Sequence, residues 1–169
     1  MKRNILICFL FLFATALQSS SLKEYSIEKL EKILVKEFHP YPTYGDDIWF
    51  KIPDSIRLVY INQAEMRIHD NWESFPASLF MEYKQTGDRN RYQNVYFKKR
   101  SQLTTLAMGE LLEGKGRFIL PLINGILSTC EETWWGLPAH YGTCLPQPED
   151  QIVALFAAQT AGDLALIQD

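Results

Sequence analysis

The segment from Asn90 to Glu113 constrains the fold most, because its apolar residues recur three or four positions apart along its whole length. That spacing places them on one face of an α-helix. The helix is expected to end at Gly114-Lys115-Gly116, since glycine readily adopts the left-handed backbone that often follows a helix. The sequence thus predicts one long amphipathic helix, whose apolar face consists of Tyr92, Val95, Tyr96, Leu103, Leu106, Ala107 and Leu111.

Five further segments show helical spacing, and none shows a β pattern of comparable strength. Pro53 and Pro76 fit helix starts, where the missing N–H of proline costs nothing. The last segment is apolar nearly all round, which favours neighbours on every side. The sequence predicts an all-α fold of antiparallel helix hairpins, with these further helices at 22–37, 53–69, 76–85, 118–132 and 148–167. The helix at 53–69 is expected to bury Ile56, Val59, Tyr60 and Ala64.

A stretch rich in proline and aromatic residues interrupts the helical spacing at 39–51. It contains two prolines, Gly45 and paired aspartates, which are typical of a surface loop. We therefore divide the chain into residues 1–16, residues 17–52 with the first helix and this loop, and residues 53–169 with the helix hairpins.

Residues 1–16 have the marks of a secretory signal, because Lys2 and Arg3 precede an apolar run that ends in Ala14-Thr15-Ala16. The run is shorter than the roughly 20 residues that cross a bilayer, so no stable membrane span is expected after cleavage. A buried N-terminal helix and an uncleaved anchor are the alternatives. Cys8 lacks the small residues that precede a lipid-anchored cysteine. The mature chain is expected to be secreted or periplasmic.

The charge balance argues against a nucleic-acid partner, because the net charge is −3 and such binders usually carry a basic surplus. Basic residues nevertheless outnumber acidic ones between positions 84 and 117. This stretch could attract an acidic polymer, and the alternative is an ordinary solvated helix face. Its basic residues are Lys84, Arg89, Arg91, Lys98, Lys99, Arg100, Lys115 and Arg117.

Cys130 and Cys144 remain after the signal, and an exported chain reaches a compartment where disulfides persist. A disulfide that closes a loop of about 15 residues is worth about 3 kcal/mol, and two buried free thiols are the alternative. His39, His69 and His140 lack the spacing of zinc ligands, and the chain has no Gly-rich phosphate loop. No metal or cofactor is expected.

A dense cluster of polar and aromatic residues ends the helix at 118–132 and continues into a loop, where binding residues commonly lie. A tryptophan face fits the C–H side of a sugar ring, a carboxylate can bind sugar hydroxyls, and His or Tyr can move a proton. The structural alternatives are packing for the tryptophans and the tyrosine, and capping or bracing of the loop for the histidine. For the glutamates they are hydrogen bonds to backbone N–H groups or pairing with a buried arginine. The candidates are Glu131, Glu132, Trp134, Trp135, His140 and Tyr141.

Several stretches between residues 50 and 165 resemble, in the same order, the N-terminal helical region of the heparinase II/III-like polysaccharide lyases. The most specific resemblance comprises Glu113-Gly114-Lys115-Gly116-Arg117-Phe118, Ile123-Asn124-Gly125-Ile126, Cys130-Glu131-Glu132 and Trp135-Gly136-Leu137-Pro138-Ala139-His140. The other stretches are 72–83 with 86–89, Arg91-Tyr92 with Arg100 and Leu103, and Leu145-Pro146 with Glu149-Asp150 and 155–161.

The resemblance implies a partial α/α toroid, which in complete members is followed by a β-sandwich region. Lyase members of the family split acidic polysaccharides by β-elimination, in which a base removes the C5 proton and preorganised donors stabilise the enolate-like charge. Complete members continue with further helices that carry an Asn/Trp-rich stretch linked to the active site, and this chain ends first.

The chain is therefore expected to be an exported N-terminal fragment of such a lyase, inactive alone. Its expected partners are an acidic polysaccharide and the missing remainder of the same protein. The resemblance assigns no catalytic residue, and it carries over Arg117, Glu131, Glu132, Trp135 and His140 as groove residues. The alternatives are an exported helical module that binds carbohydrate or protein without catalysis, and a purely structural remnant.

Overall fold

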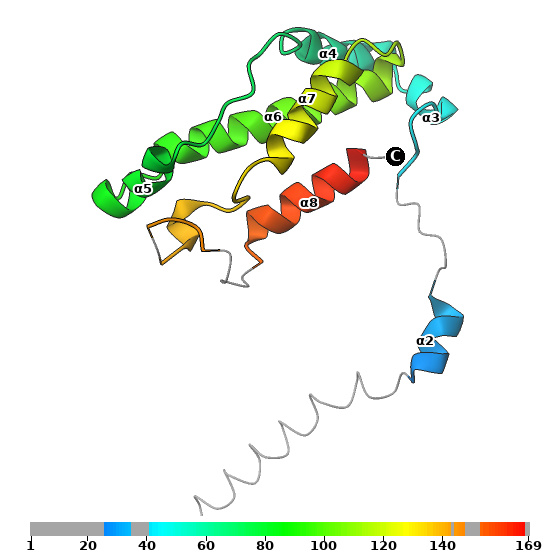
Figure 1. Cartoon of the computed structure of the whole chain (residues 1–169). Coiled ribbons are helices and arrows are strands. Elements are labelled where there is room, and N and C mark those ends of the chain that lie inside the picture. The colour runs from blue at the N-terminus through cyan, green and yellow to red at the C-terminus, as the bar shows by residue number, and fades with distance from the viewer. Residues whose placement is uncertain (1–25, 35–40, 143, 148–152, 168–169) are drawn as a thin grey trace, which may run out of the picture. The chain divides into compact units, whose positions relative to one another are not determined.

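The computed structural model describes residues 26–34, 41–142, 144–147 and 153–167 (Figure 1). All regular secondary structure within these ranges is helical, which confirms the predicted all-α class. The partial toroid stays a prediction. The signal predicted at 1–16 lies outside the described residues.

The chain divides into two units between residues 41 and 42. In the first unit, helix α2 (Ile27–Ile33) begins after Ser26, whose Oγ accepts a hydrogen bond from the backbone N–H of Lys29 at 3.2 Å. A serine in this position satisfies an N–H that has no partner within the helix. α2 is the middle of the helix predicted at 22–37, whose two ends lie outside the described residues.

In the second unit the central element is α6, and the five other α-helices of this unit all contact it (Figure 1). α3, which the sequence division grouped with residues 17–52, belongs to this unit. No helix in the described ranges is both long enough and apolar enough to cross a bilayer. The elements are α3 (Asp47–Phe50), α4 (Asp54–Glu65), α5 (Ala77–Thr86), α6 (Asn90–Glu113), α7 (Ile119–Cys130), the short 3-10 helix η1 (Pro138–His140) and α8 (Leu155–Ile167).

The predicted ends of α5 and α6 are confirmed by their caps. Gly87 follows α5 with φ of 78°, and Gly114 follows α6 with φ of 67°. This is the left-handed region that glycine enters without a Cβ penalty. Pro53 and Pro76 occupy the N-cap positions of α4 and α5. The start predicted for the last helix falls at 148–152, outside the described residues.

A buried carboxylate fixes the connection from α6 to α7. Glu110 Oε1 accepts hydrogen bonds from the Gly116 N–H at 2.6 Å and from the Tyr44 hydroxyl at 3.0 Å, while Oε2 accepts from the Phe118 N–H at 3.0 Å. The two amides lie at the start of α7, where N–H groups lack a helical partner. The hydrogen bond to Glu110 raises the pKa of Tyr44, so its hydroxyl remains a donor.

The core consists of two clusters along α6. The N-terminal cluster contains the buried residues Phe80, Tyr92, Tyr96, Leu137 and Tyr141, and it joins α5 and the loop after α7 to the first half of α6. The C-terminal cluster contains Ala64, Leu106 and Phe118, and it joins α4 and the start of α7 to the second half. The long helix therefore carries two separate packing sites.

The prediction of the buried face of α4 is wrong except at Ala64. Ile56, Val59 and Tyr60 are each about half exposed, whereas Ile61 and Ala64 are buried. α4 carries apolar residues on two faces, so periodicity could not choose between them. The choice is made by α6, because Gly109 allows a close approach at Ala64.

α8 packs against fewer neighbouring elements than its apolar composition favours. Within the described ranges it contacts α6, and its buried residue is Thr160. Leu155 and Leu166 are 71% and 52% exposed. The helices that the structure describes therefore leave part of its apolar surface uncovered.

We predict that Gly109→Ala destabilises the second unit. A Cβ at Gly109 would lie 2.3 Å from the Cβ of Ala64, so α4 and α6 must move apart. Overpacking of this kind costs about 1–3 kcal/mol, measured by urea unfolding.

The matched control is Gly162→Ala in α8, where an added Cβ meets nothing within 4 Å. Alanine is favoured over glycine within a helix, so this variant should be neutral or slightly more stable. Equal effects of the two substitutions would contradict the close approach of α4 and α6.

Candidate functional site

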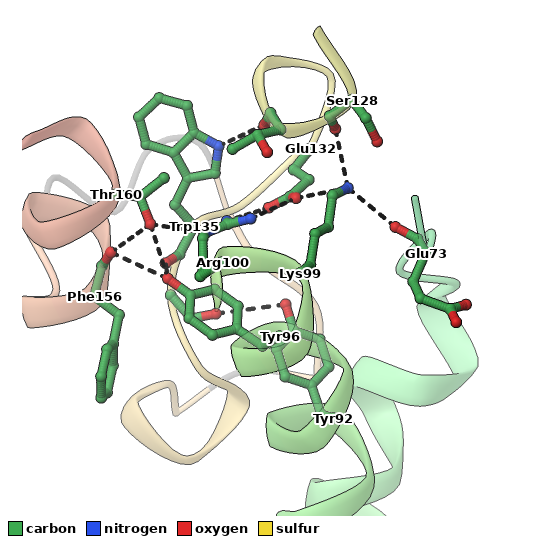
Figure 2. A network of polar contacts seen from close by, with 12 residues as sticks. Glu73, Tyr92, Tyr96, Lys99, Arg100, Ser128, Glu132, Trp135, Phe156 and Thr160 are labelled. Atoms are coloured by element: carbon green, nitrogen blue, oxygen red, sulfur yellow. Dashed lines mark hydrogen bonds and ion pairs between the residues drawn. The ribbon is translucent and has the colours of Figure 1, made fainter. Parts of the chain in front are cut away.

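The site centres on a buried carboxylate that two cations share (Figure 2). Arg100 donates to Glu132 in bidentate fashion, from Nη1 to Oε1 at 2.8 Å and from Nη2 to Oε2 at 2.5 Å. Lys99 Nζ lies 2.9 Å from Glu132 Oε1. The side chains of Lys99, Arg100 and Glu132 are 1%, 7% and 5% exposed. Among the roles considered for the glutamates, pairing with a buried arginine is observed for Glu132.

Lys99 is fully engaged by the protein. Besides Glu132, its ammonium donates to the backbone carbonyls of Glu73 at 3.0 Å and Ser128 at 3.1 Å. Nζ also lies 5.3 Å from the centroid of the Phe75 ring. An ammonium has three N–H donors, so Lys99 ties the segment before α5 and the end of α7 to α6.

Further hydrogen bonds of the network hold the loop after α7 and helix α8 against α6. Arg100 Nε donates to Thr160 Oγ1 at 3.0 Å. The Tyr96 hydroxyl lies 2.9 Å from Thr160 Oγ1, 2.9 Å from the Trp135 carbonyl and 3.1 Å from the Phe156 carbonyl (Figure 2). The indole N–H of Trp135 donates to the Thr129 carbonyl at 2.8 Å.

Two groups of the network, Arg100 and Tyr92, have shifted pKa values. Burial lowers the pKa of Arg100, but the hydrogen bonds and charge of Glu132 outweigh it, so the net shift is upward. Burial raises the pKa of Tyr92, and the negative charge of Glu132 adds to this effect. The guanidinium thus stays charged, and the phenol of Tyr92 stays protonated.

Beside the network lies a cavity of about 520 Å³. Aromatic rings form much of its wall, and the lining also contains hydroxyl and carboxylate groups. Pockets of this kind, apolar with a few placed polar groups, are the usual form of small-molecule sites. The lining residues are Ser74, Phe75, Ala77, Phe80, Tyr92, Lys99, Ser128, Glu131, Glu132, Thr133, Trp134, Leu145 and Pro146.

The structure brings most of the predicted site residues together. Glu131, Glu132 and Trp134 line the cavity. Tyr141 lies behind Trp134, with ring centroids 4.5 Å apart at 78°, so Tyr141 packs rather than facing the cavity. Trp135 belongs to the hydrogen-bond network.

Two predicted residues lie apart from the cavity. The exposed His140 stacks on Phe156 with ring centroids 5.7 Å apart, and it does not line the cavity. Arg117 lies at the far end of α6, where it pairs with Glu113 at 2.5 Å and with Glu65. The hypothesis of a groove shared by Arg117 and the loop residues is therefore not supported by their positions.

Sequence reasoning missed the partners of Glu132 as site residues. Lys99 and Arg100 follow Tyr96 by three and four positions and precede Leu103 by four and three, so they lie on the apolar face of α6. Charged residues on a buried face need partners. That signal was present in the sequence, whereas nothing in the sequence identified Thr160 as a partner.

The basic stretch between residues 84 and 117 is not one exposed patch. Lys99 and Arg100 are buried against Glu132, and four other basic residues form ion pairs elsewhere, two of them with the same glutamate. Those four are Arg91 with Glu82, Lys98 with Glu73, Lys115 with Glu113, and Arg117 with Glu113 and Glu65.

Cys130 and Cys144 are both exposed and are not bonded to each other in the structure. The arrangement thus differs from both sequence-based alternatives, a disulfide and two buried thiols. Among the described residues no group of His, Cys, Asp and Glu is placed to hold a metal ion.

Comparison with known protein families and curated proteins found no match. No protein-family model matches the chain, and no curated protein matches it. The resemblance to the heparinase II/III-like lyases therefore rests on the sequence motifs alone and stays a hypothesis.

We predict that Glu132→Ala strongly destabilises the second unit. It would leave Lys99 and Arg100 buried without their shared carboxylate, and breaking a buried pair in this way costs about 3–5 kcal/mol. The measurement is the free energy of unfolding in urea.

The control is Glu82→Ala, which removes a 2.7 Å ion pair with Arg91, whose side chain is 68% exposed. Surface pairs contribute at most about 1 kcal/mol. If Glu132→Ala cost no more than this control, the network would not hold the loop.

Proposed function

We propose that this chain is the exported, non-catalytic N-terminal part of a heparinase II/III-like polysaccharide lyase and that it binds a saccharide unit in the cavity beside Glu132. The observation that carries the proposal is the cavity itself, whose lining includes both aromatic rings and hydrogen-bonding groups. The family part of the proposal is supported by the motifs between residues 113 and 140.

A saccharide suits this lining for a physical reason. Sugar rings present both C–H faces and hydroxyl groups, so they need apolar area and hydrogen-bond partners side by side. Trp134 and Phe80 provide apolar area, while Ser74, Thr133 and Glu131 provide hydroxyl and carboxylate oxygens. Lys99 and Arg100 contribute little to saccharide binding, because their hydrogen-bond donors already bind the protein.

The same geometry favours binding over β-elimination. A base must take the C5 proton, and a candidate base needs a pKa near the working pH. The pKa of Tyr92 is raised by burial, which disfavours this role. His140 lies outside the lining. We therefore assign the described part of the chain no catalytic step.

A protein-binding module is the second candidate, and one observation favours it. Leu120, Ile123 and Leu127 on α7 are 67%, 52% and 58% exposed. Clustered apolar exposure commonly marks a contact surface. Substituting these three residues by serine would abolish such a contact and leave saccharide binding intact, so the two functions are separable.

Trp134→Ala should weaken saccharide binding by about tenfold or more, equivalent to ~1.4 kcal/mol, because it removes one aromatic wall. The measurement is calorimetric titration with uronate-containing and neutral oligosaccharides. Trp49→Ala is the control, since Trp49 lies in α3 and does not line the cavity. Equal loss in both variants, or no binding by the parent chain, would refute the cavity as a saccharide site.

The export part of the proposal has its own test. Expression in a secreting host should give a mature chain that starts at Leu17, read by N-terminal sequencing, because Ala14-Thr15-Ala16 fits a cleavage site. The purified chain should form no unsaturated products from acidic polysaccharides by ultraviolet absorbance. An intact N-terminus would contradict export by this signal, and strong absorbance would contradict the non-catalytic assignment.

A further inference from the structure

Two exposed cysteines lie beside the cavity, on segments that form parts of the same lining. Cys130 ends α7 and directly precedes the lining residue Glu131, and Cys144 directly precedes the lining residue Leu145. We propose that Cys130 and Cys144 are an oxidation site, whose disulfide joins the two segments and tightens saccharide binding in the cavity. The effect on binding rests on the proposed saccharide-binding function, whereas the disulfide itself does not.

The two cysteines lie at the open side of the cavity. Glu131 and Leu145 are lining residues that are exposed, so they belong to the rim. Consecutive Cα atoms are about 3.8 Å apart, so the backbone of each cysteine is directly attached to that rim. Neither Cys130 nor Cys144 is itself a lining residue. A disulfide between them would therefore lie outside the lining and leave the interior free for a ligand.

The bond would connect parts of the lining that are held by different helices. Lys99 of α6 pairs with Glu132 at 2.9 Å, so the chain just after α7 is fixed to α6. On the other side, the Lys84 ammonium of α5 donates to the Gly142 carbonyl at 3.0 Å, two residues before Cys144. That hydrogen bond is exposed to water. A disulfide would thus add a covalent link from α7 to a segment that α5 holds through a surface contact.

The chemistry requires an oxidant, which is a low-molecular-weight disulfide such as glutathione disulfide. Both thiols are exposed, so such a molecule reaches them. The thiolate of one cysteine attacks the oxidant, whose S–S bond breaks as one glutathione thiolate leaves. The other cysteine thiolate then attacks the mixed disulfide, which forms the bond between Cys130 and Cys144 and releases the second glutathione thiolate.

Atoms and electrons balance in this exchange. The two protons that the cysteines lose are taken up by the two glutathione thiolates, so two cysteine thiols are oxidised and one glutathione disulfide is reduced. An exported chain reaches a compartment in which such bonds persist. The proposed export and the oxidation site are therefore consistent with each other.

The disulfide is expected to raise the affinity for a ligand through preorganisation. Leu145 and Pro146 contribute to the lining from the segment that begins at Cys144. A wall that is held in place before the ligand arrives loses less conformational entropy on binding, and a disulfide is one way to hold it. We expect the oxidised chain to bind a saccharide about tenfold more tightly than the reduced chain.

The test for the bond uses the full chain with Cys8→Ser, which leaves Cys130 and Cys144 as its cysteines. After incubation with glutathione disulfide, the mass should fall by two hydrogen atoms, and no thiol should react with a thiol-specific reagent. Peptide mapping should show Cys130 linked to Cys144, and dithiothreitol should restore both thiols. Stable glutathione adducts, dimers joined by disulfides, or two thiols that remain reactive would overturn the oxidation site.

The test for the effect compares the oxidised and reduced forms by calorimetric titration with a cellulose oligomer and a polygalacturonate oligomer. The oxidised form should bind the oligomer that the chain prefers about tenfold more tightly. The matched control carries Cys8→Ser, Cys130→Ser and Cys144→Ser together. It should show the affinity of the reduced chain both before and after treatment with glutathione disulfide.

The outcomes separate this inference from the proposal beneath it. Equal or weaker binding by the oxidised form, with the disulfide present, would overturn the effect on binding and leave the saccharide site standing. Binding by the reduced chain without any formation of the disulfide would overturn the oxidation site alone. If neither form bound either oligomer, the saccharide site and the effect on binding would both be refuted, and the mass measurement would still decide the disulfide.

Discussion

The structure of the second unit depends on the carboxylate of Glu132 lying between Lys99 and Arg100. An uncompensated charge in a protein interior is far more costly than a surface one, so two adjacent buried cations on α6 require an anion from elsewhere. Glu132 provides it from the residues just after α7. This requirement fixes where the loop after α7 crosses α6.

The remaining polar groups extend that constraint to neighbouring elements. Lys99 reaches the carbonyl of Glu73 before α5, while Arg100 and Tyr96 reach Thr160 in α8. The walls of the cavity are therefore set by α5, α6 and the loop together. The donors of Lys99 and the Nε, Nη1 and Nη2 atoms of Arg100 are thereby engaged in holding this arrangement.

α7 is held by a buried carboxylate at each end. At its start, Glu110 of α6 accepts hydrogen bonds from the backbone amides of Gly116 and Phe118. Past its end, Glu132 returns to α6 through Arg100. Between the two, Gly125 packs against the Trp72 indole, whose nearest atoms would lie 2.3 Å from an added Cβ. Polar contacts thus set the position of a helix whose own residues are mostly apolar.

The sequence by itself determined the helical class and the bounds of α5 and α6, because these follow from local spacing and from glycine caps at Gly87 and Gly114. It also located the loop after α7 that contributes Glu131, Glu132 and Trp134 to the cavity. Only the tertiary structure decided which face of α4 is buried, that Arg117 lies apart from the loop, and that Thr160 completes the network. Those features depend on contacts between residues distant in sequence, such as Arg100 with Thr160, and local periodicity carries no information about them.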